Sequence, residues 1–301
     1  MFGRARIEMG DVGEVTSQVY QRRREELRLA PLVEVSARFG LLASLGELMA
    51  FRGLLWMLIV REVKIRYSQT LLGIGWAIAQ PLVLMFAFTV FFGRFAGISS
   101  DGLPYPLFSY AGLLPWTFFA TSLAFGVPSL VTNTPLVARV YFPREILPLA
   151  SVLSAGVDFG AAALVYIAFM AIYHIAPTLV LVHLVPLLLV QLVLTVAVTL
   201  ALAAINVFYR DVRYVLPVVT QIWLFATPVI YPLSVVPEGI RATYLAINPL
   251  AGVIDGYRRV LAAGTSPDMS SLALSAVSSI GLLIVAYVCF KQVERSFADV
   301  I

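Results

Sequence analysis

Long apolar runs that contain no charged residue dominate the pattern of hydrophobic and polar positions along the chain. A helix needs about 20 apolar residues to cross the hydrocarbon layer of a membrane, and five uncharged stretches reach that length. They cover Tyr67 to Gly93, Gly102 to Ala138, Phe159 to Tyr209, Tyr214 to Pro237 and Met269 to Phe290. This pattern predicts a helical protein that crosses the membrane several times.

The third stretch is long enough for two crossings, and Pro177 divides it, because proline ends a helix and permits a turn. We therefore expect helices over roughly Leu147 to Tyr173 and Thr178 to Phe208, and six transmembrane helices in total. Prolines are expected to break the ends of the second stretch. The composition agrees, since 60% hydrophobic residues against 13% charged residues lies outside the range of soluble domains.

The basic residues predict the orientation, because segments rich in arginine and lysine stay on the cytoplasmic side. With the N-terminus inside, seventeen of the 21 basic residues fall in cytoplasmic segments, so a nucleic-acid-binding surface is not needed to explain them. Both termini are then cytoplasmic. The predicted division is an N-terminal extension over 1–46, an amphipathic interface helix over 47–70, a six-span domain over 71–291 and a C-terminal tail over 292–301.

A charged helix directly precedes the first predicted span. Its apolar residues recur with helical spacing on one stripe, namely Trp56, Val60, Val63 and Tyr67. Its charges lie along the two flanks of that stripe, namely Arg61, Glu62, Lys64 and Arg66. Such a helix can lie flat at the membrane interface, where its cations reach lipid phosphates or an acidic partner. Gly73 and Gly75 favour an elbow before the first span, and Trp76 suits the headgroup level.

The segment between the last two spans, residues 236–268, contains no uncharged run long enough to cross the membrane. Its longest uncharged run, Ala242 to Ile254, is interrupted by Asn248 and Pro249. We expect two short helices that enter the outer face and return, and the alternative is an ordinary external loop with surface helices. Asp255, Arg258 and Arg259 form either an outer gate network or a simple surface pair one helical turn apart.

Few titratable side chains lie inside the predicted spans. Asp158 is the one carboxylate deep in a span, and we expect a structural hydrogen-bonding role for it, since no second titratable group can be placed beside it for a proton relay. His174 and His183 are isolated near the outer boundary and predict no metal site. Cys289 has no partner for a disulfide. No cofactor is expected.

Several longer motifs, in one order, resemble a known family. They are REVKIRYSQTLLGIGWAIAQP at 61–81, VYFPREILPLASVLSAGVDF at 140–159, NVFYRDVRYVLPVVTQIWLFATPVIYPLSVVPEG at 206–239 and INPLAGVIDGYR at 247–258. Together they are similar to the permeases of ABC transporters that export bacterial surface polysaccharides, the group with the O-antigen, capsule and teichoic acid exporters. The resemblance implies a multi-pass protein of the bacterial inner membrane that moves a lipid-linked polysaccharide.

The resemblance also implies a separate ATP-binding cassette ATPase subunit. These 301 residues contain no phosphate-binding loop of the G-x-x-x-x-G-K-[ST] type, so the chain is not expected to be an enzyme. Thr134 and Pro135 can start a short helix that Pro143 ends or bends, and the family uses this connection as a coupling helix. The residues expected to contact the ATPase are Arg61, Lys64, Arg66, Arg139, Tyr141, Phe142, Arg144 and Glu145. The alternative is that the arginines only obey the positive-inside rule.

Six spans are few for a pore, and a two-fold homodimer is the usual way to close one. If the chain matches its family, the first and fifth spans line a channel on the dimer axis. A sugar path needs aromatic and neutral polar side chains, and the candidates are Trp76, Phe88, Phe92, Phe95, Gln221, Trp223, Phe225 and Tyr231. The alternative is that these aromatics face lipid or neighbouring helices. The outer gate would contain Asn248, Pro249, Asp255, Arg258 and Arg259.

Two rival functions make other demands on the sequence. A secondary transporter driven by an ion gradient would show internal repeats and buried charges at the midplane, and only Asp158 lies at that depth. A membrane-embedded glycosyl or acyl transferase would need an acid–base pair or metal-binding carboxylates, and the sequence contains no such cluster. The sequence therefore favours the export permease, with membrane lipids as its surroundings.

Overall fold

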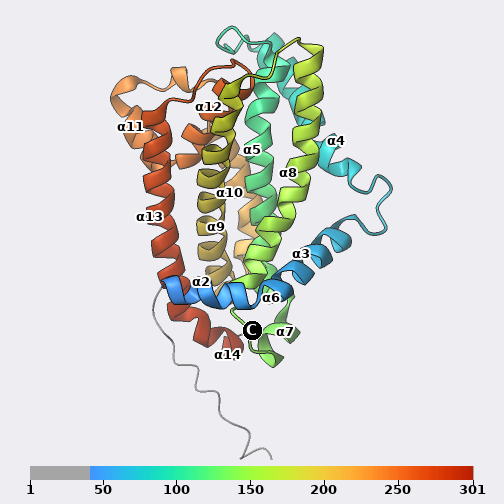
Figure 1. Cartoon of the computed structure of the whole chain (residues 1–301), viewed down its shortest axis with the longest axis vertical. Coiled ribbons are helices and arrows are strands. Elements are labelled where there is room, and N and C mark those ends of the chain that lie inside the picture. The colour runs from blue at the N-terminus through green and yellow to red at the C-terminus, as the bar shows by residue number, and fades with distance from the viewer. Residues whose placement is uncertain (1–40, 301) are drawn as a thin grey trace, which may run out of the picture. The chain divides into compact units, whose positions relative to one another are not determined.

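A computed structural model describes residues 41–300, and every regular element in that range is a helix (Figure 1). The predicted all-α class is therefore confirmed. One compact unit comprises Glu47–Ile301, and the preceding unit is Met1–Gly46. The predicted extension over 1–46 lies outside the described residues, except for the start of α2 (Leu41–Ala50).

Within residues 41–300, five helical segments are long and apolar enough to cross a membrane. Three of them join two kinds of helix end to end. The five are α4 (Gly75–Phe88) with the π-helix η1 (Thr89–Phe95), α5 (Tyr105–Gly126), α8 (Ile146–Ile172), the 3₁₀-helix η2 (Leu179–His183) with α9 (Leu184–Phe208), and α13 (Met269–Val293) with η4 (Glu294–Ser296).

The fifth predicted span is shorter in the structure. Its helix, α10, covers Val212–Ala226, which is 15 residues or about 22 Å at 1.5 Å per residue, against about 30 Å of hydrocarbon. The helix ends because Thr227 precedes Pro228, and a residue before proline avoids helical geometry. Thr227 is extended, with φ −102° and ψ 144°. The six-span topology therefore stays a prediction.

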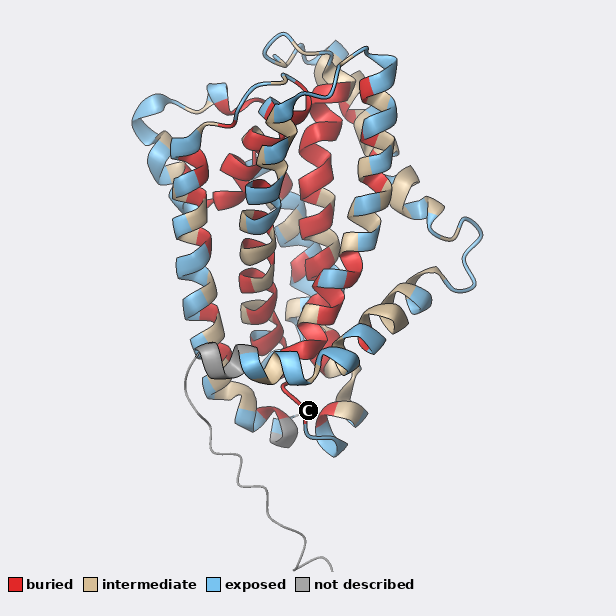
Figure 2. Cartoon of the chain, in the orientation of Figure 1, coloured by how far each residue is buried: buried red, intermediate tan, exposed pale blue. Residues whose placement is uncertain are grey.

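α5 lies at the centre of the helical unit. It contacts α4, α8, α9, α10 and the short helix α12 (Pro249–Leu261). Figure 2 shows α5 buried along most of its length, whereas α13 has exposed residues along its length and α8 is buried mainly in its first half. An apolar helix surrounded by other helices needs no polar face, which explains why the sequence of α5 shows little segregation of polar residues.

The predicted breaks occur where the prolines lie. α5 ends at Gly126, and two short helices follow, α6 (Ser129–Thr132) and α7 (Thr134–Arg139). α8 ends at Ile172, and His174 occupies the left-handed region with φ 56° before the chain returns. The predicted helix over Thr178 to Phe208 begins as a 3₁₀ segment and continues as α9.

The two short helices expected before the last span are present. After the short 3₁₀ turn η3 (Leu233–Val235) they are α11 (Glu238–Ile247) and α12, and Asn248 separates them. α12 contacts α5, α9 and α13 and is buried over most of its length. A Cβ atom on Gly252 would lie 2.3 Å from the Ser275 hydroxyl oxygen, so glycine allows α12 to approach α13 closely. α12 is thus an interior element of the bundle.

The charged helix before the first span is α3 (Arg52–Tyr67), and it packs against α8. Leu58 is its buried residue, whereas Trp56 of the predicted apolar stripe is 68% exposed. Trp56 of the predicted stripe thus faces away from the protein, and the placement of this helix at the membrane interface stays a prediction. At the other end of the chain, α14 (Phe297–Val300) is anchored by Phe297, which is buried against Phe290 and Phe208.

Candidate functional site

A pocket lies at the elbow between α3 and α4. α3 ends at Tyr67, the chain turns through Gln69 and Gly73, both with positive φ, and α4 begins at Gly75. The pocket has a volume of about 220 Å³ and is open to the outside. Residues of α3, α4, α5 and α8 line it, among them Arg66, Tyr67, Trp76, Gln80, Phe125 and Asp158. The turn expected at Gly73 is present, whereas Gly75 is already the first residue of α4.

Asp158 and Arg66 form an ion pair at the inner wall of this pocket. Arg66 also donates to the hydroxyl of Ser154 at 3.0 Å and lies 4.1 Å from the centre of the Phe125 ring. Tyr67 donates its hydroxyl to the other carboxylate oxygen of Asp158. Burial, with the neighbouring carboxylate, raises the pKa of Tyr67, so the hydroxyl keeps its proton at neutral pH. Asp158 thus makes hydrogen bonds as predicted, whereas the expectation that no titratable group lies beside it is wrong, because Tyr67 and Arg66 contact its carboxylate.

The sequence did not reveal the partner of Asp158. Arg66 lies 92 residues earlier and was expected to point at lipid or at another protein, yet only 9% of its side chain is exposed. A buried carboxylate requires a cation or several donors. That requirement, together with the cluster of arginines before the first span, is the signal from which the pairing could have been inferred.

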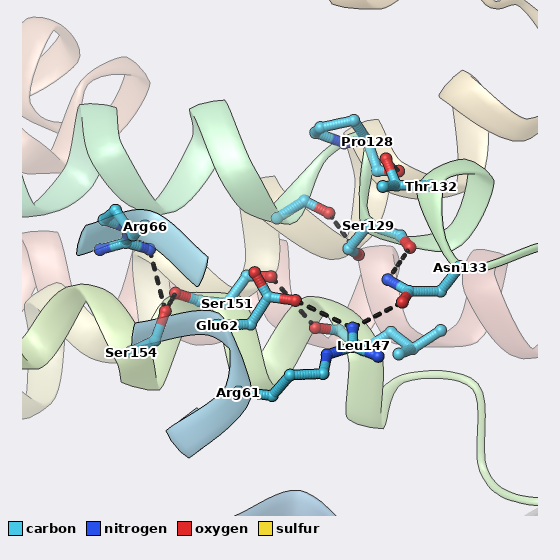
Figure 3. A network of polar contacts seen from close by, with 11 residues as sticks. Arg61, Glu62, Arg66, Pro128, Ser129, Thr132, Asn133, Leu147, Ser151 and Ser154 are labelled. Atoms are coloured by element: carbon cyan, nitrogen blue, oxygen red, sulfur yellow. Dashed lines mark hydrogen bonds and ion pairs between the residues drawn. The ribbon is translucent and has the colours of Figure 1, made fainter. Parts of the chain in front are cut away.

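Arg61 connects α3 to the segment that leads into α7. Figure 3 shows its guanidinium between Glu62 and Asn133 and shows Arg66 directed at Ser154. Asn133 in turn donates to the carbonyl oxygen of Ser129 at 2.8 Å. Lys64, by contrast, is exposed. Of the three predicted cations on this helix, two therefore hold α3 to its own protein and one is free to contact other molecules.

The predicted coupling connection has an exposed tip and a buried base. α7 begins at Thr134, as predicted, and ends at Arg139, before Pro143. Arg139 is exposed and Tyr141 is 61% exposed, and the Tyr141 hydroxyl donates to Glu47 at 3.3 Å. Phe142 is buried in a cluster with Leu58 and Phe290.

The charges that follow the connection turn inward. Glu145 is fully buried, so the expectation that it offers a charge to a soluble partner is wrong. Its carboxylate accepts from Lys291 of α13 at 2.8 Å, and Lys291 also pairs with Glu294 at 2.9 Å. The backbone N–H of Arg144 donates to the Glu294 carboxylate at 3.0 Å. Burial and the nearby Glu294 raise the pKa of Glu145. A partly buried ion cluster thus joins the connection to the end of α13.

The predicted aromatic stripe of the first span is divided. Phe88 is buried and contacts Phe92 edge to face, and both pack in the core, while Phe95 is 78% exposed and contacts Phe91. The reason is the π-helix over Thr89–Phe95, whose wider turn shifts the register on which the stripe was based. Trp76 is 51% exposed at the elbow pocket.

The predicted channel residues of α10 also divide between two faces. Gln221 and Phe225 are exposed, whereas Trp223 contacts Phe119 edge to face and donates its indole N–H to Asn248 at 3.2 Å. Tyr231 follows the helix and packs against the core. The exposed face of α10 is therefore available to another molecule, and the opposite face holds the turn between α11 and α12.

Asn248 holds that turn through both of its polar atoms. The amide oxygen accepts from Trp223, and the amide nitrogen donates to the Thr227 hydroxyl at 2.9 Å. Pro249 starts α12 and is buried. Asn248 thereby ties the break between two short helices to the break at the end of α10, which explains why a buried polar residue is tolerated here.

Arg258 separates from its predicted partners. Asp255 and Arg259 form a pair four residues apart at 2.7 Å, with Arg259 half-exposed, which confirms the simpler prediction for these two. Arg258 is buried, and its guanidinium donates to the backbone carbonyl oxygens of four residues, Phe108, Pro228, Val229 and Tyr231. Its centre lies 3.6 Å from the centre of the Phe108 ring.

Three of the four carbonyl groups that Arg258 binds lie after the end of α10, and the fourth belongs to Phe108 in α5. Helix ends leave carbonyl groups without partners, and in a membrane such groups are costly unless the protein satisfies them. Arg258 supplies the missing donors and so joins the non-helical segment 228–231 to α5. An uncharged run followed by Thr–Pro and Tyr–Pro, with an arginine in the second of the two short helices that follow, is the sequence signal for this arrangement.

Comparison with known proteins places the chain among transport proteins. The model of the ABC-2 type transporter family matches residues 53–262. The chain is 33% identical over 255 residues to the O-antigen export system permease protein RfbA of Myxococcus xanthus, which covers 84% of this chain and 97% of that protein. An RfbA of Klebsiella pneumoniae is 28% identical over 243 residues, covering 80% and 92%. The polysialic acid transport protein KpsM of Escherichia coli is 23% identical over 247 residues, covering 79% and 93%.

Proposed function

The chain belongs to the ABC-2 type transporter family, and from this premise we propose that it is the permease subunit of an exporter that moves a lipid-linked polysaccharide across the bacterial inner membrane. One observation carries the proposal. A relative with 33% identity, matched over 97% of its own length, is an O-antigen export permease. The family model matches residues 53–262, which include nearly all of α3 and all of α12, the elements that distinguish this chain from a simple helical bundle.

The energy would come from a separate ATPase subunit, because these 301 residues contain no phosphate-binding loop. The proposed docking surface is the exposed tip around Arg139 and Tyr141, together with Lys64 of α3. Movement of that tip would be transmitted inward by the ion cluster of Glu145, Lys291 and Glu294, which connects the tip to α13. Glu145 is then a positioning residue that acts without touching the ATPase.

The channel would form between two copies of the chain. α10 contacts α5 and α9 and exposes Gln221 and Phe225 on its other face. A two-fold dimer would bring two such faces together with the exposed part of α4 and η1, which includes Phe95. Neutral polar and aromatic side chains suit a sugar chain that must slide without being held.

The test is to purify the chain from membranes of its own host and to identify what accompanies it. The proposal predicts an ATP-binding cassette subunit in equal amount, a mass for two copies of each, and loss of surface polysaccharide when the gene is deleted. Purification of the chain alone from a host that keeps its surface polysaccharide after the deletion would contradict the proposal.

A further inference from the structure

The elbow pocket between α3 and α4 contains an anion position that the protein fills with its own carboxylate. Arg66 and Tyr67 donate to the two oxygens of Asp158, and Ser154 lies beside them. Two donors that bind the two oxygens of one group can bind a phosphate or a carboxylate in the same way. Asp158 therefore occupies the place that the oxygens of an anionic ligand would take.

The guanidinium of Arg66 does not use all of its hydrogen-bond donors. The Nε of Arg66 is buried and has no hydrogen-bond partner among the described residues. A guanidinium has five N–H donors, and a buried donor without a partner costs free energy. A phosphate has three acceptor oxygens, so it can accept from the Arg66 and Tyr67 donors that now bind Asp158 and keep an oxygen for a further donor.

The rest of the pocket suits the headgroup of a lipid. Trp76, Phe125 and Gln80 line it with aromatic and neutral polar groups, which suit sugar or glycerol carbons next to a phosphate. The turn beside it exposes Leu71, Leu72 and Ile74. Charged α3 ends here and uncharged α4 begins, so a molecule in the pocket can place its headgroup on Arg66 and its chain along the apolar turn.

We propose that the elbow pocket binds the phosphate headgroup of a lipid, which displaces Asp158 from Arg66 and Tyr67. Displacement breaks one of the contacts that hold α8, which carries Asp158, to the end of α3. Binding of a lipid in the pocket therefore changes how α3 is held against the protein. The phosphate can belong to a lipid of the bilayer or to the lipid carrier of the polysaccharide. The inference deepens the proposed function, and it needs only the premise that the chain lies in a membrane.

The test is a binding titration on the purified full-length chain in a neutral detergent. The probes are dioctanoyl phosphatidylglycerol for a bilayer lipid, farnesyl pyrophosphate for a lipid carrier, dioctanoylglycerol as the lipid without phosphate, and inorganic phosphate. We expect saturable binding of at least one phosphate lipid, and no binding of dioctanoylglycerol. Tighter binding of one phosphate lipid than the other identifies the source. Equal binding of inorganic phosphate would overturn the proposal, because the site would then take a free anion.

Three variants separate an anion site from a structural ion pair. Arg66→Gln removes the cation and should weaken binding at least about tenfold. Asp158→Asn keeps the size and one acceptor but removes the competing charge, and should tighten binding by about three- to tenfold. Arg52→Gln removes an exposed cation from the same helix and should change nothing.

The decisive result is the direction in which Asp158→Asn changes the affinity for the lipid, because it is expected to be opposite to that of Arg66→Gln. If Asp158 only supports the fold, Asp158→Asn will weaken binding together with Arg66→Gln, and that outcome overturns the proposal. Should Arg66→Gln fail to fold, the Asp158→Asn titration still gives the answer. Because no ATPase and no transport are involved, failure of this test leaves the export function intact, and failure of export leaves the binding result intact.

Discussion

Arg258 and Arg259 are adjacent in sequence, yet the structure predicts very different consequences for the same substitution. Arg258 is buried and donates to four backbone carbonyl oxygens, whereas 47% of the Arg259 side chain is exposed and it pairs only with Asp255. Arg258→Met removes every donor and keeps most of the side-chain length. Arg259→Met is the matched control.

The expected cost follows from the carbonyl groups left behind. Phe108 lies inside α5, where the helix supplies another donor, so the loss falls on the carbonyls of residues 228, 229 and 231. A buried polar group without a partner costs about 1–3 kcal/mol. Three such groups give about 3–9 kcal/mol, which is comparable to the total stability of about 5–15 kcal/mol of many proteins. An exposed ion pair contributes about 0–1 kcal/mol.

The assay is heating of the detergent-purified chain followed by size-exclusion chromatography of what stays in solution. Arg258→Met should lose the folded peak at a much lower temperature than the wild type, or give none, while Arg259→Met should match the wild type. Arg258→Lys should lie between them, because one ammonium group reaches fewer carbonyls than a planar guanidinium. Equal melting of Arg258→Met and Arg259→Met would refute the role assigned to Arg258.

Three further predictions test other parts of the structure. Lys291→Met should destabilise the chain by about 3–5 kcal/mol, because it leaves Glu145 buried without its cation. Adding Glu145→Gln to this variant should restore most of the lost stability. If the double variant melts no higher than Lys291→Met in the heating assay, the pairing is contradicted. Gly252→Ala should cost about 1–3 kcal/mol through a clash with α13. Gly156→Ala, where a Cβ atom meets nothing within 4 Å, should leave stability unchanged or raise it by up to about 1 kcal/mol, because alanine is favoured over glycine inside a helix. The same melting temperature for both variants would contradict the close approach of α12. Tyr141→Ala should lower ATP hydrolysis by the complex without lowering the yield of folded permease, as measured by phosphate release, and unchanged hydrolysis would place the docking surface elsewhere.

Uncharged length and proline positions allowed the main helices to be predicted from the sequence. The break at 173–178, the short helix from Thr134 and the pair of helices divided at Asn248 were all expected for these reasons. The end of α10 was not, because the count of uncharged residues continued through Thr227 and Pro228. The geometry before a proline stops a helix even where hydropathy continues.

The site was harder to predict, because its contacts join residues far apart in the chain. The cations of α3 were expected to point outward, which is the usual positive-inside pattern, yet Arg66 turns to Asp158 across 92 residues. Glu145 likewise turns to Lys291 across 146 residues. Helical periodicity places a charge on a flank of its own helix, but it contains no information about which helix packs against that flank.

The aromatic stripe of the first span shows a third limit. Phe88, Phe92 and Phe95 share a face only if the helix keeps 3.6 residues per turn, and the π-helix after Phe88 breaks that register. Residue spacing therefore predicts a face reliably only inside a regular helix. Near an irregular segment, the face on which a side chain lies can be read only from the structure.

The central claim is that this chain provides a membrane path and takes its energy from a partner. The most direct measurement is polysaccharide transfer and ATP hydrolysis in vesicles that contain the purified chain with or without an ATP-binding cassette subunit from the same host. The account predicts neither activity with the chain alone and both with the pair. ATP hydrolysis or polysaccharide transfer by the chain alone would contradict it.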